Sequence, residues 1–299
     1  MSSPAYYCPC CGYQTLNAPP PGSYEICPIC FWEDANPCPD PDDYLYANPT
    51  WNSNDYRAWN SNEVSLRDAQ QNFIQFGVCE PHWRNEVRPP TPQDRRDPNW
   101  HNIEEAAHQA SLKVSQQIET AFAEVSREDG ITLHEADMID NYGTPAELLA
   151  ARKKDPDTRW QDIPDEVIAR LYCSLTYLDP VAWRYYVPAY MVWTLKNKNY
   201  ATSDSMSIES TLYALNITLK DLDLPKFEAL NFPQSQAVYQ FLTFICQYGD
   251  TFDQETAHSA LKKYWGKFAP PPTDNASQLL YYFFIFRGLF FGSWLIQGQ

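Results

Sequence analysis

The chain has 299 residues, 44% hydrophobic and 15% aromatic, which is enough for substantial folded cores and excludes a disordered chain. Its formal net charge of −16 disfavours direct binding of nucleic acid, because contacts to phosphates need clustered lysine and arginine. The N-terminus lacks the charged, apolar and small-residue succession of a secretory signal. Nine cysteines without such a signal indicate a reducing compartment and metal binding in preference to disulfides, so we expect a cytoplasmic protein.

Four cysteines near the N-terminus have the spacing of a metal site. Cys8 and Cys11 form one C-x-x-C pair, Cys27 and Cys30 form another, and 15 residues separate the pairs. This spacing is typical of a structural zinc site in which four thiolates surround the ion tetrahedrally. Four thiolates leave no open position for water, so we expect one structural zinc ion and no catalysis there. The alternative is a set of buried or disulfide-bonded cysteines.

The residues around these cysteines fit tight turns. Pro9 and Pro28 follow the first cysteine of each pair and fix φ near −65°. Gly12 follows the first pair, where such a turn often needs a residue that tolerates a positive φ. Each turn therefore presents two sulfurs to one side.

A family resemblance rests on these motifs. The runs CPCCGYQTL, PPPGSYEICPICFWED and NEVSLRDAQQNF resemble the cysteine-rich CPCC domain, a small bacterial zinc-knuckle module. The likeness covers about the first 100 residues and departs from the pattern between Trp32 and Asn62, where this chain carries extra residues. Members of that family occur as immunity proteins of polymorphic toxin systems, and the resemblance implies this role here.

The negative charge is concentrated near the N-terminus. Residues 1–56 contain no lysine or arginine. The acidic residues there are Glu25, Glu33, Asp34, Asp40, Asp42, Asp43 and Asp55. Four thiolates on one zinc ion add roughly two further negative charges. A basic protein surface is the partner that this charge favours, although an acidic chain can also be merely soluble.

Residues 33–62 read as a long ordered loop, because they combine aspartate, asparagine, proline and aromatic residues without a helical period. Rigid aromatic side chains among polar ones are typical of binding loops, but they could instead cover the small zinc module. The residues that we predict to contact a partner are Asp40, Asp42, Asp43, Trp51, Tyr56 and Trp59.

A helix is predicted from Ser65, its N-cap, to Gly77. Leu66, Ala69, Phe73 and Phe76 recur on one face of it, which we expect to pack against the knuckles. Beyond it, Cys79 and His82 have C-x-x-H spacing. With Cys10 and Cys38 they offer a possible second metal site, although lone cysteines are more often buried apolar residues.

Prolines alternate with charges over residues 87–99, which indicates a semi-rigid linker or a chain lying along a surface. We therefore predict two domains, 1–98 with the zinc site and 99–299 mainly helical. In the second, apolar periodicity predicts a helix from Ile103 to about Ser126. Capping boxes predict helix starts at Thr132 and Thr144.

Further helices are predicted after Pro180, after Pro233 up to Gly249, and over 253–265. Pro188 is expected to break or kink the first of them. Residues 204–219 are ambiguous between helix and strand. Part of this region, roughly 117–249, resembles an uncharacterised bacterial domain, which supports a bacterial origin and brings no catalytic residues.

Residues 279–296 are nearly all apolar and just reach the length of a membrane-spanning helix. Arg287 at their centre would cost several kcal/mol in lipid. We expect a C-terminal core helix in which Arg287 pairs with an acid, and the alternative is a membrane anchor.

One cluster has residue types suited to catalysis, namely His134, Glu135, Asp137 and Asp140. On a helix His134, Asp137 and Asp140 could share a face, but no second histidine completes an H-E-x-x-H motif. The sequence therefore predicts an α+β, mainly α protein that is not an enzyme. The function it favours is an immunity protein that occludes a toxin such as an ADP-ribosyltransferase or nuclease. The alternatives are a zinc-ribbon regulator that binds nucleic acid and a metal-dependent hydrolase at His134.

Overall fold

The structure, a computed structural model, describes residues 6–35, 62–197, 206–218 and 220–270. A two-stranded antiparallel sheet begins it, with β1 (Tyr6–Tyr7) paired to β2 (Gln14–Leu16). The rest of the described chain is helix and irregular backbone. The predicted α+β, mainly α class is thus confirmed, with a cysteine cluster at the N-terminus.

The first helix, α1 (Leu66–Phe76), begins and ends where the sequence predicts. The Ser65 side chain accepts a hydrogen bond from the Asp68 N–H, and Gly77 closes the helix in the left-handed region with φ of 78°. Leu66 and Ala69 are buried, but Phe76 is 36% exposed, so the predicted apolar face stops one turn earlier. A short 3-10 helix, η3 (Pro81–Asn85), follows.

The proline-rich segment lies along the surface of the first cysteine turn. Arg95 accepts a backbone hydrogen bond from the Gln14 N–H at 2.8 Å, and the Asp97 N–H donates to the Gly12 carbonyl at 2.9 Å. The Arg96 side chain donates to the Cys11 carbonyl at 3.0 Å and lies over the Trp100 ring. Of the two predicted forms, the chain along a surface is the one observed. The division into domains at 98/99 stays a prediction.

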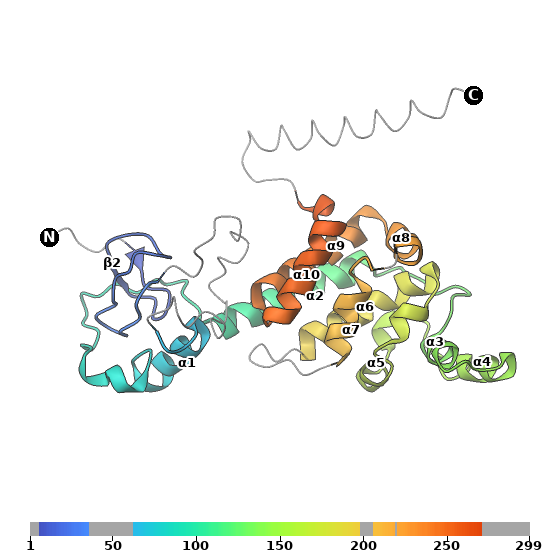
Figure 1. The fold of residues 1–299 in the computed structure, drawn as a ribbon, viewed down its shortest axis with the longest axis horizontal. Helices are drawn as coiled ribbons and strands as arrows, with labels where there is room; N and C mark the ends of the chain where they lie inside the picture. The colour runs from blue at the N-terminus through green and yellow to red at the C-terminus, as the bar shows by residue number, and fades with distance from the viewer. Residues whose placement is uncertain (1–5, 36–61, 198–205, 219, 271–299) are drawn as a thin grey trace, which may run out of the picture.

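Nine further α-helices follow in the described chain, with short 3-10 segments before α5, before α6 and after α10 (Figure 1). They are α2 (Ile103–Ala121), α3 (Leu133–Asp140), α4 (Pro145–Arg152), α5 (Asp165–Arg170), α6 (Pro180–Asn197), α7 (Met206–Ala214), α8 (Lys220–Glu228), α9 (Phe232–Tyr248) and α10 (Thr251–Lys263). The 3-10 segments are η4 (Trp160–Asp162), η5 (Ser174–Tyr177) and η6 (Trp265–Phe268). The N-terminal unit lies at one end of the long axis and the α3–α4 pair at the other (Figure 1).

The centre of the helical part is α6, which is buried on all sides along most of its length. Trp183, Tyr186 and Tyr190 are fully buried in it. The helix runs through Pro188 without a break, so of the expected break or kink the break is wrong. A proline removes one backbone hydrogen bond and costs about 3 kcal/mol, and packing by α2, α7 and α8 around α6 offsets this cost.

The capping boxes at Thr132 and Thr144 are both formed, so these predicted helix starts are confirmed. The helix from Ile103 ends at Ala121, earlier than predicted, because the buried Phe122 caps it and its carbonyl accepts a hydrogen bond from the Trp160 indole at 2.9 Å. The ambiguous stretch forms α7. No helix in the described part is long and apolar enough to cross a membrane, and residues 279–296 lie outside that part.

Candidate functional site

The two cysteine turns share one backbone pattern. In the first, the Cys8 N–H donates to the Tyr13 carbonyl at 2.8 Å and the Gly12 N–H donates to the Cys8 carbonyl at 2.9 Å. In the second, the Cys27 N–H donates to the Trp32 carbonyl at 2.9 Å and the Phe31 N–H donates to the Cys27 carbonyl at 2.8 Å. The same turn is thus built twice from unrelated flanking residues.

The fifth residue of each turn has a positive φ, 74° at Gly12 and 68° at Phe31. At Gly12 the space is also closed, because a Cβ there would lie 2.4 Å from Cγ of Trp100. At Phe31 a side chain is present in this disfavoured region, and its ring stacks on Trp83 with centroids 4.3 Å apart. The first turn therefore requires glycine, whereas the stacking contact compensates for the strain of the second.

The turns bring the four predicted ligands together. Cys8, Cys11, Cys27 and Cys30 are fully buried and unoxidised, and their sulfurs lie within 4.8 Å of one another. Two sulfur pairs, Cys8 with Cys30 and Cys11 with Cys27, are each 3.7 Å apart. A tetrahedron with 2.3 Å arms has an edge of about 3.8 Å, whereas a disulfide bond measures about 2 Å. The quartet could bind a metal ion, and the disulfide alternative is excluded for it.

The electrostatics of the quartet also fit a cation. Burial raises the pKa values of the Cys8 and Cys30 thiols well above their usual range. Hydrogen bonds from Cys11, Cys30 and Cys8 lower the pKa of Cys27, and the Thr15 hydroxyl donates to its sulfur at 3.2 Å. Several buried thiolates at this spacing repel one another, so full ionisation needs a bound cation.

The suggested second cysteine site is not assembled among the described residues. Cys10 and Cys79 are buried beside the quartet and burial raises the pKa of both thiols, while Cys38 lies outside the described residues. His82 converges instead with two carboxylates, Glu63 and Glu80. The sequence gives no signal for that grouping, because its members lie on either side of α1.

The residues predicted to contact a partner lie outside the described residues, and their role stays a prediction. They are Asp40, Asp42, Asp43, Trp51, Tyr56 and Trp59. Two other acidic residues of the N-terminal region have internal roles. Asp34 is buried and accepts a hydrogen bond from the Ser23 N–H at 2.8 Å, and Glu25 accepts one from the Asn17 N–H at 2.7 Å.

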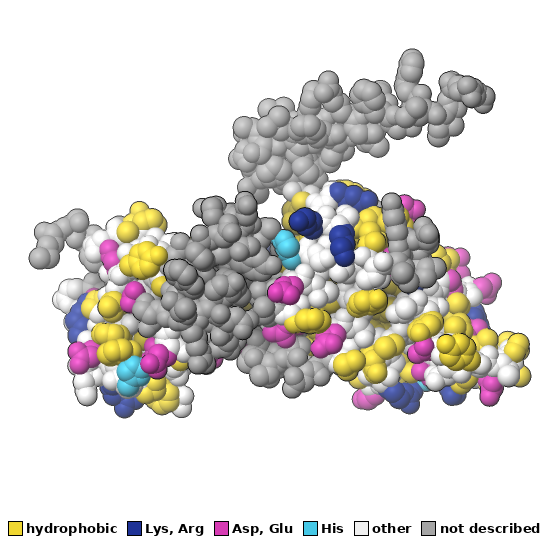
Figure 2. Space-filling view, viewed as in Figure 1, with side chains coloured by type: hydrophobic (Ala, Val, Ile, Leu, Met, Phe, Trp, Pro, Cys, Tyr) yellow, Lys and Arg dark blue, Asp and Glu magenta, His cyan; other side chains and the backbone are white. Residues whose placement is uncertain are grey.

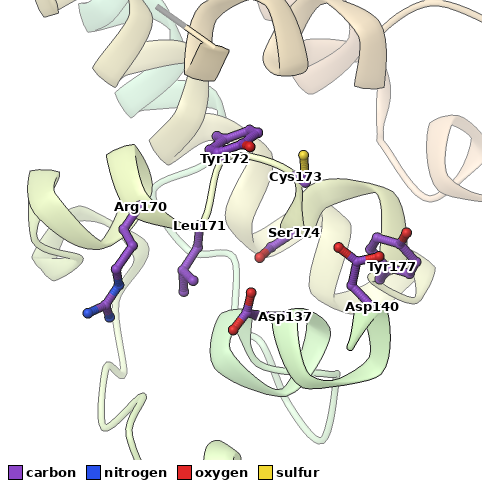
Figure 3. Close-up of a pocket in the computed structure, with 8 residues that line it drawn as sticks. All are labelled: Asp137, Asp140, Arg170, Leu171, Tyr172, Cys173, Ser174 and Tyr177. Carbon is purple, nitrogen blue, oxygen red and sulfur yellow. The ribbon is translucent and has the colours of Figure 1, made fainter. Parts of the chain in front are cut away.

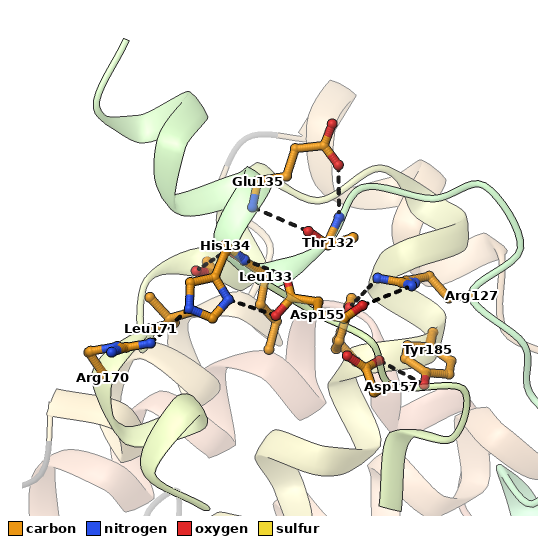
Figure 4. A network of polar contacts seen from close by, with 12 residues as sticks. Arg127, Thr132, Leu133, His134, Glu135, Asp155, Asp157, Arg170, Leu171 and Tyr185 are labelled. Carbon is orange, nitrogen blue, oxygen red and sulfur yellow. Dashed lines mark hydrogen bonds and ion pairs between the residues drawn. The ribbon is translucent and has the colours of Figure 1, made fainter. Parts of the chain in front are cut away.

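The His134 cluster forms a network of polar contacts (Figure 4). The His134 ring contacts Asp155 through Nδ1 at 2.6 Å and Arg170 through Nε2 at 2.7 Å. A guanidinium can only donate, so Nε2 accepts and the proton resides on Nδ1. Glu135 accepts from the Thr132 N–H at 3.2 Å and from Arg152 at 2.8 Å. Both ring nitrogens are therefore engaged, which leaves His134 no nitrogen for a metal in this arrangement.

Asp137 and Asp140 project from α3 into a cleft of about 190 Å³ (Figure 3). The other lining residues are Arg170, Leu171, Tyr172, Cys173, Ser174 and Tyr177. A hydrogen bond to Asp140 raises the pKa of the Tyr177 phenol. The cleft is polar and acidic on its α3 side, which suits a cationic group better than an anionic one.

Beside this cleft, Tyr142 is 96% exposed and has a positive φ of 59°. Positive φ is uncommon for a residue of this size and costs about 1–2 kcal/mol. An aromatic side chain held in this way between α3 and α4 gains no burial from the fold itself. Sequence reasoning missed it, although the Tyr142-Gly143 pair marks the turn.

These features define a class of protein, a mainly helical chain with a cluster of four buried cysteines at its N-terminus that could bind a metal ion. The chain belongs to the family of unknown function (DUF6714), whose model matches residues 109–269. Residues 6–94 match the model of the cysteine-rich CPCC family. No curated protein and no solved structure is similar enough to the chain to match it.

Proposed function

We propose that the protein is an immunity protein that binds a cognate antibacterial toxin and covers its active site. The CPCC match of the N-terminal unit supports this role, because the resemblance to that family implies it. The net charge of −16 supports the mode, in which acidic side chains meet a basic or anion-binding cleft. Toxins that act on nucleic acids or on NAD have such clefts, since their substrates are anionic. The protein itself catalyses nothing in this proposal and works in the cytoplasm.

One observation carries the proposal, the exposed Tyr142 beside an acidic cleft. Binding energy at protein interfaces concentrates in aromatic anchors surrounded by complementary charge. Asp137 and Asp140 supply negative charge next to this tyrosine, and the nearby Arg152 is paired with Glu135. On the face in Figure 2, acidic side chains are scattered over both ends of the molecule.

We further propose that the quartet of Cys8, Cys11, Cys27 and Cys30 holds zinc. Full burial of all four sulfurs supports a closed structural site, in which the ion cross-links the two turns and no position faces a substrate. Elemental analysis of the purified chain should find zinc, and the protein should be colourless. A red protein would identify iron in the same thiolates.

The role is tested by survival of cells that express the toxin encoded beside this protein. We expect co-expression of the wild-type chain to restore growth and Tyr142→Ser to weaken toxin binding at least 30-fold, which corresponds to a hot spot of about 2 kcal/mol. Tyr213→Ser is the matched control, because Tyr213 is 55% exposed on α7 and is not one of the residues that line the cleft.

The possible outcomes test the immunity role and the toxin-binding surface around Tyr142 separately. Growth that co-expression fails to restore would remove the immunity role. Protection by Tyr142→Ser equal to that by the wild type would keep the role and reject this surface. A salt-sensitive mobility shift with DNA or RNA would instead favour the zinc-ribbon regulator.

A further inference from the structure

A second group of potential metal ligands lies outside the cysteine quartet. The side-chain ligand atoms of Glu63, Glu80 and His82 lie within 4.8 Å of one another. Glu63 precedes α1, Glu80 precedes η3, and His82 is in η3. A hydrogen bond of 3.1 Å from the Glu63 N–H to Oε1 of Glu80 connects the two backbone segments that carry these residues.

Burial of Glu80 points to a bound cation. The residue is only 3% exposed, and no lysine, arginine or histidine forms an ion pair with it in the described part of the chain. A buried carboxylate is costly unless a cation or several hydrogen bonds compensate for its charge, and metal coordination is one usual solution. The Glu63 N–H supplies one hydrogen bond, which does not balance a full charge.

Hydrogen bonds and ring contacts hold the backbone that carries Glu80 and His82 in place. The Cys79 N–H donates to the Cys30 carbonyl at 2.7 Å, and the Asn72 side chain donates to the Cys79 carbonyl at 2.8 Å. The His82 ring packs on Trp83, which in turn stacks on Phe31 of the second cysteine turn. The backbone that carries Glu80 and His82 is therefore tied to the knuckle and to α1.

We propose that Glu63, Glu80 and His82 bind a second divalent transition-metal ion, distinct from the ion of the cysteine quartet. Two carboxylates and an imidazole are a ligand set that Zn²⁺ accepts, whereas Mg²⁺ and Ca²⁺ prefer oxygen alone. Arms of about 2.1 Å bring ligand atoms to within about 4.2 Å of one another, so small side-chain rotations close the site. Three protein ligands leave a position for water or for a group of a bound molecule. The inference does not depend on the proposed immunity role.

Zinc stoichiometry of the reduced full-length chain tests the proposal, measured by equilibrium dialysis against buffered free Zn²⁺ followed by elemental analysis. We expect two zinc ions per wild-type chain and one per chain for His82→Ala and for Glu80→Gln. Glutamine keeps an oxygen to accept the Glu63 N–H, so the fold is retained. The matched control is His101→Ala, since His101 is exposed and its ring lies 3.6 Å from the Glu105 carboxylate, and this variant should keep two ions.

Titration with Co²⁺ distinguishes the sites. The first equivalent should show intense sulfur-to-cobalt charge-transfer absorption, and the second should add only weaker bands of oxygen and nitrogen ligands. His82→Ala should lower the affinity for the second equivalent at least tenfold and leave the sulfur bands unchanged. A wild-type chain that takes up one ion overturns the proposal, as does a second ion that persists in His82→Ala. If Glu80→Gln does not fold, the exposed His82 still decides the question.

Discussion

The N-terminal unit and the helical part are held together in different ways. Most of the fully buried apolar residues around the two turns are cysteines, together with a few larger residues such as Leu16 and Ile29. In the helical part, by contrast, a single helix, α6, already supplies a nearly continuous run of buried residues from Ala182 to Leu195. Small units with so little apolar core commonly rely on a metal or disulfide cross-link, which supports the proposed zinc site, whereas the helices are stabilised by burial of their own side chains.

Removal of the metal should produce the largest effect and should affect one region only. We expect Cys27→Ala, or a chelator under reducing conditions, to unfold the N-terminal unit, because structural zinc contributes on the order of 10 kcal/mol to such modules. Limited proteolysis should cut within residues 6–94 while α2 to α10 stay resistant. An N-terminal unit that remains resistant without metal would mean that its apolar contacts suffice.

The reciprocal control is Trp265→Ala. Trp265 is fully buried and its indole donates to the Leu215 carbonyl at 2.7 Å, so the change should cost about 3–5 kcal/mol. The zinc content should stay unchanged. A loss of zinc in this variant would show that the two regions unfold together.

The two cysteine turns allow a sharper comparison within the first region. Gly12→Ala should destabilise the N-terminal unit by about 2 kcal/mol or more, because alanine is strained at this φ and would displace Trp100. Phe31→Gly removes similar strain but loses the ring contact with Trp83, so its net effect should be below about 1 kcal/mol. Denaturant unfolding of the zinc-loaded variants measures both. Equal losses would mean that the turns are energetically equivalent.

The smallest effect concerns the surface loop that holds the proline-rich segment. Arg88 binds Asp94 through two hydrogen bonds of 2.7 Å, and this ion pair holds the pKa of the Asp94 carboxyl well below its usual range. A lowered folded-state pKa means that the pair stabilises the fold above the ordinary carboxyl pKa of about 4, and that this contribution is lost as pH falls through the folded value.

We expect Asp94→Asn to cost about 1 kcal/mol or less at pH 7, as is usual for exposed pairs. The difference in the free energy of unfolding between Asp94→Asn and the wild type should disappear in strong acid, where the Asp94 carboxyl is protonated. Stability curves of the two proteins at several pH values test this expectation. Curves that stay parallel down to the lowest pH would show that the carboxylate does not stabilise the loop.

Local signals predicted the cysteine quartet and the helix starts at Ser65, Thr132 and Thr144. Cysteine spacing is a property of a short stretch of chain, and the caps at Ser65, Thr132 and Thr144 act within three residues of themselves. The convergence of Glu63 with Glu80 could not be predicted, because it depends on how α1 folds back. The same holds for the pairing of His134 with Asp155, which lies 21 residues away in the sequence.

The expected break at Pro188 was wrong for a related reason. The intrinsic cost of proline in a helix is local, but the packing that offsets it comes from three other helices. The domain boundary, the partner and the immunity role lie beyond what local patterns determine, and each has its own experiment.

The Gln70 amide is one of the contacts that join the two regions, beside the ion pair of Arg67 with Glu104. The Gln70 side chain donates to the Pro9 carbonyl at 2.9 Å and accepts from the Ile103 N–H, at the first residue of α2, at 2.7 Å. The amide nitrogen of Gln70 thus contacts the first cysteine turn, and the amide oxygen contacts the N-terminus of α2. The fluorescence of a dye attached near the start of α2 should consequently change when the cysteine quartet binds a metal ion, although the dye is not in contact with the sulfurs.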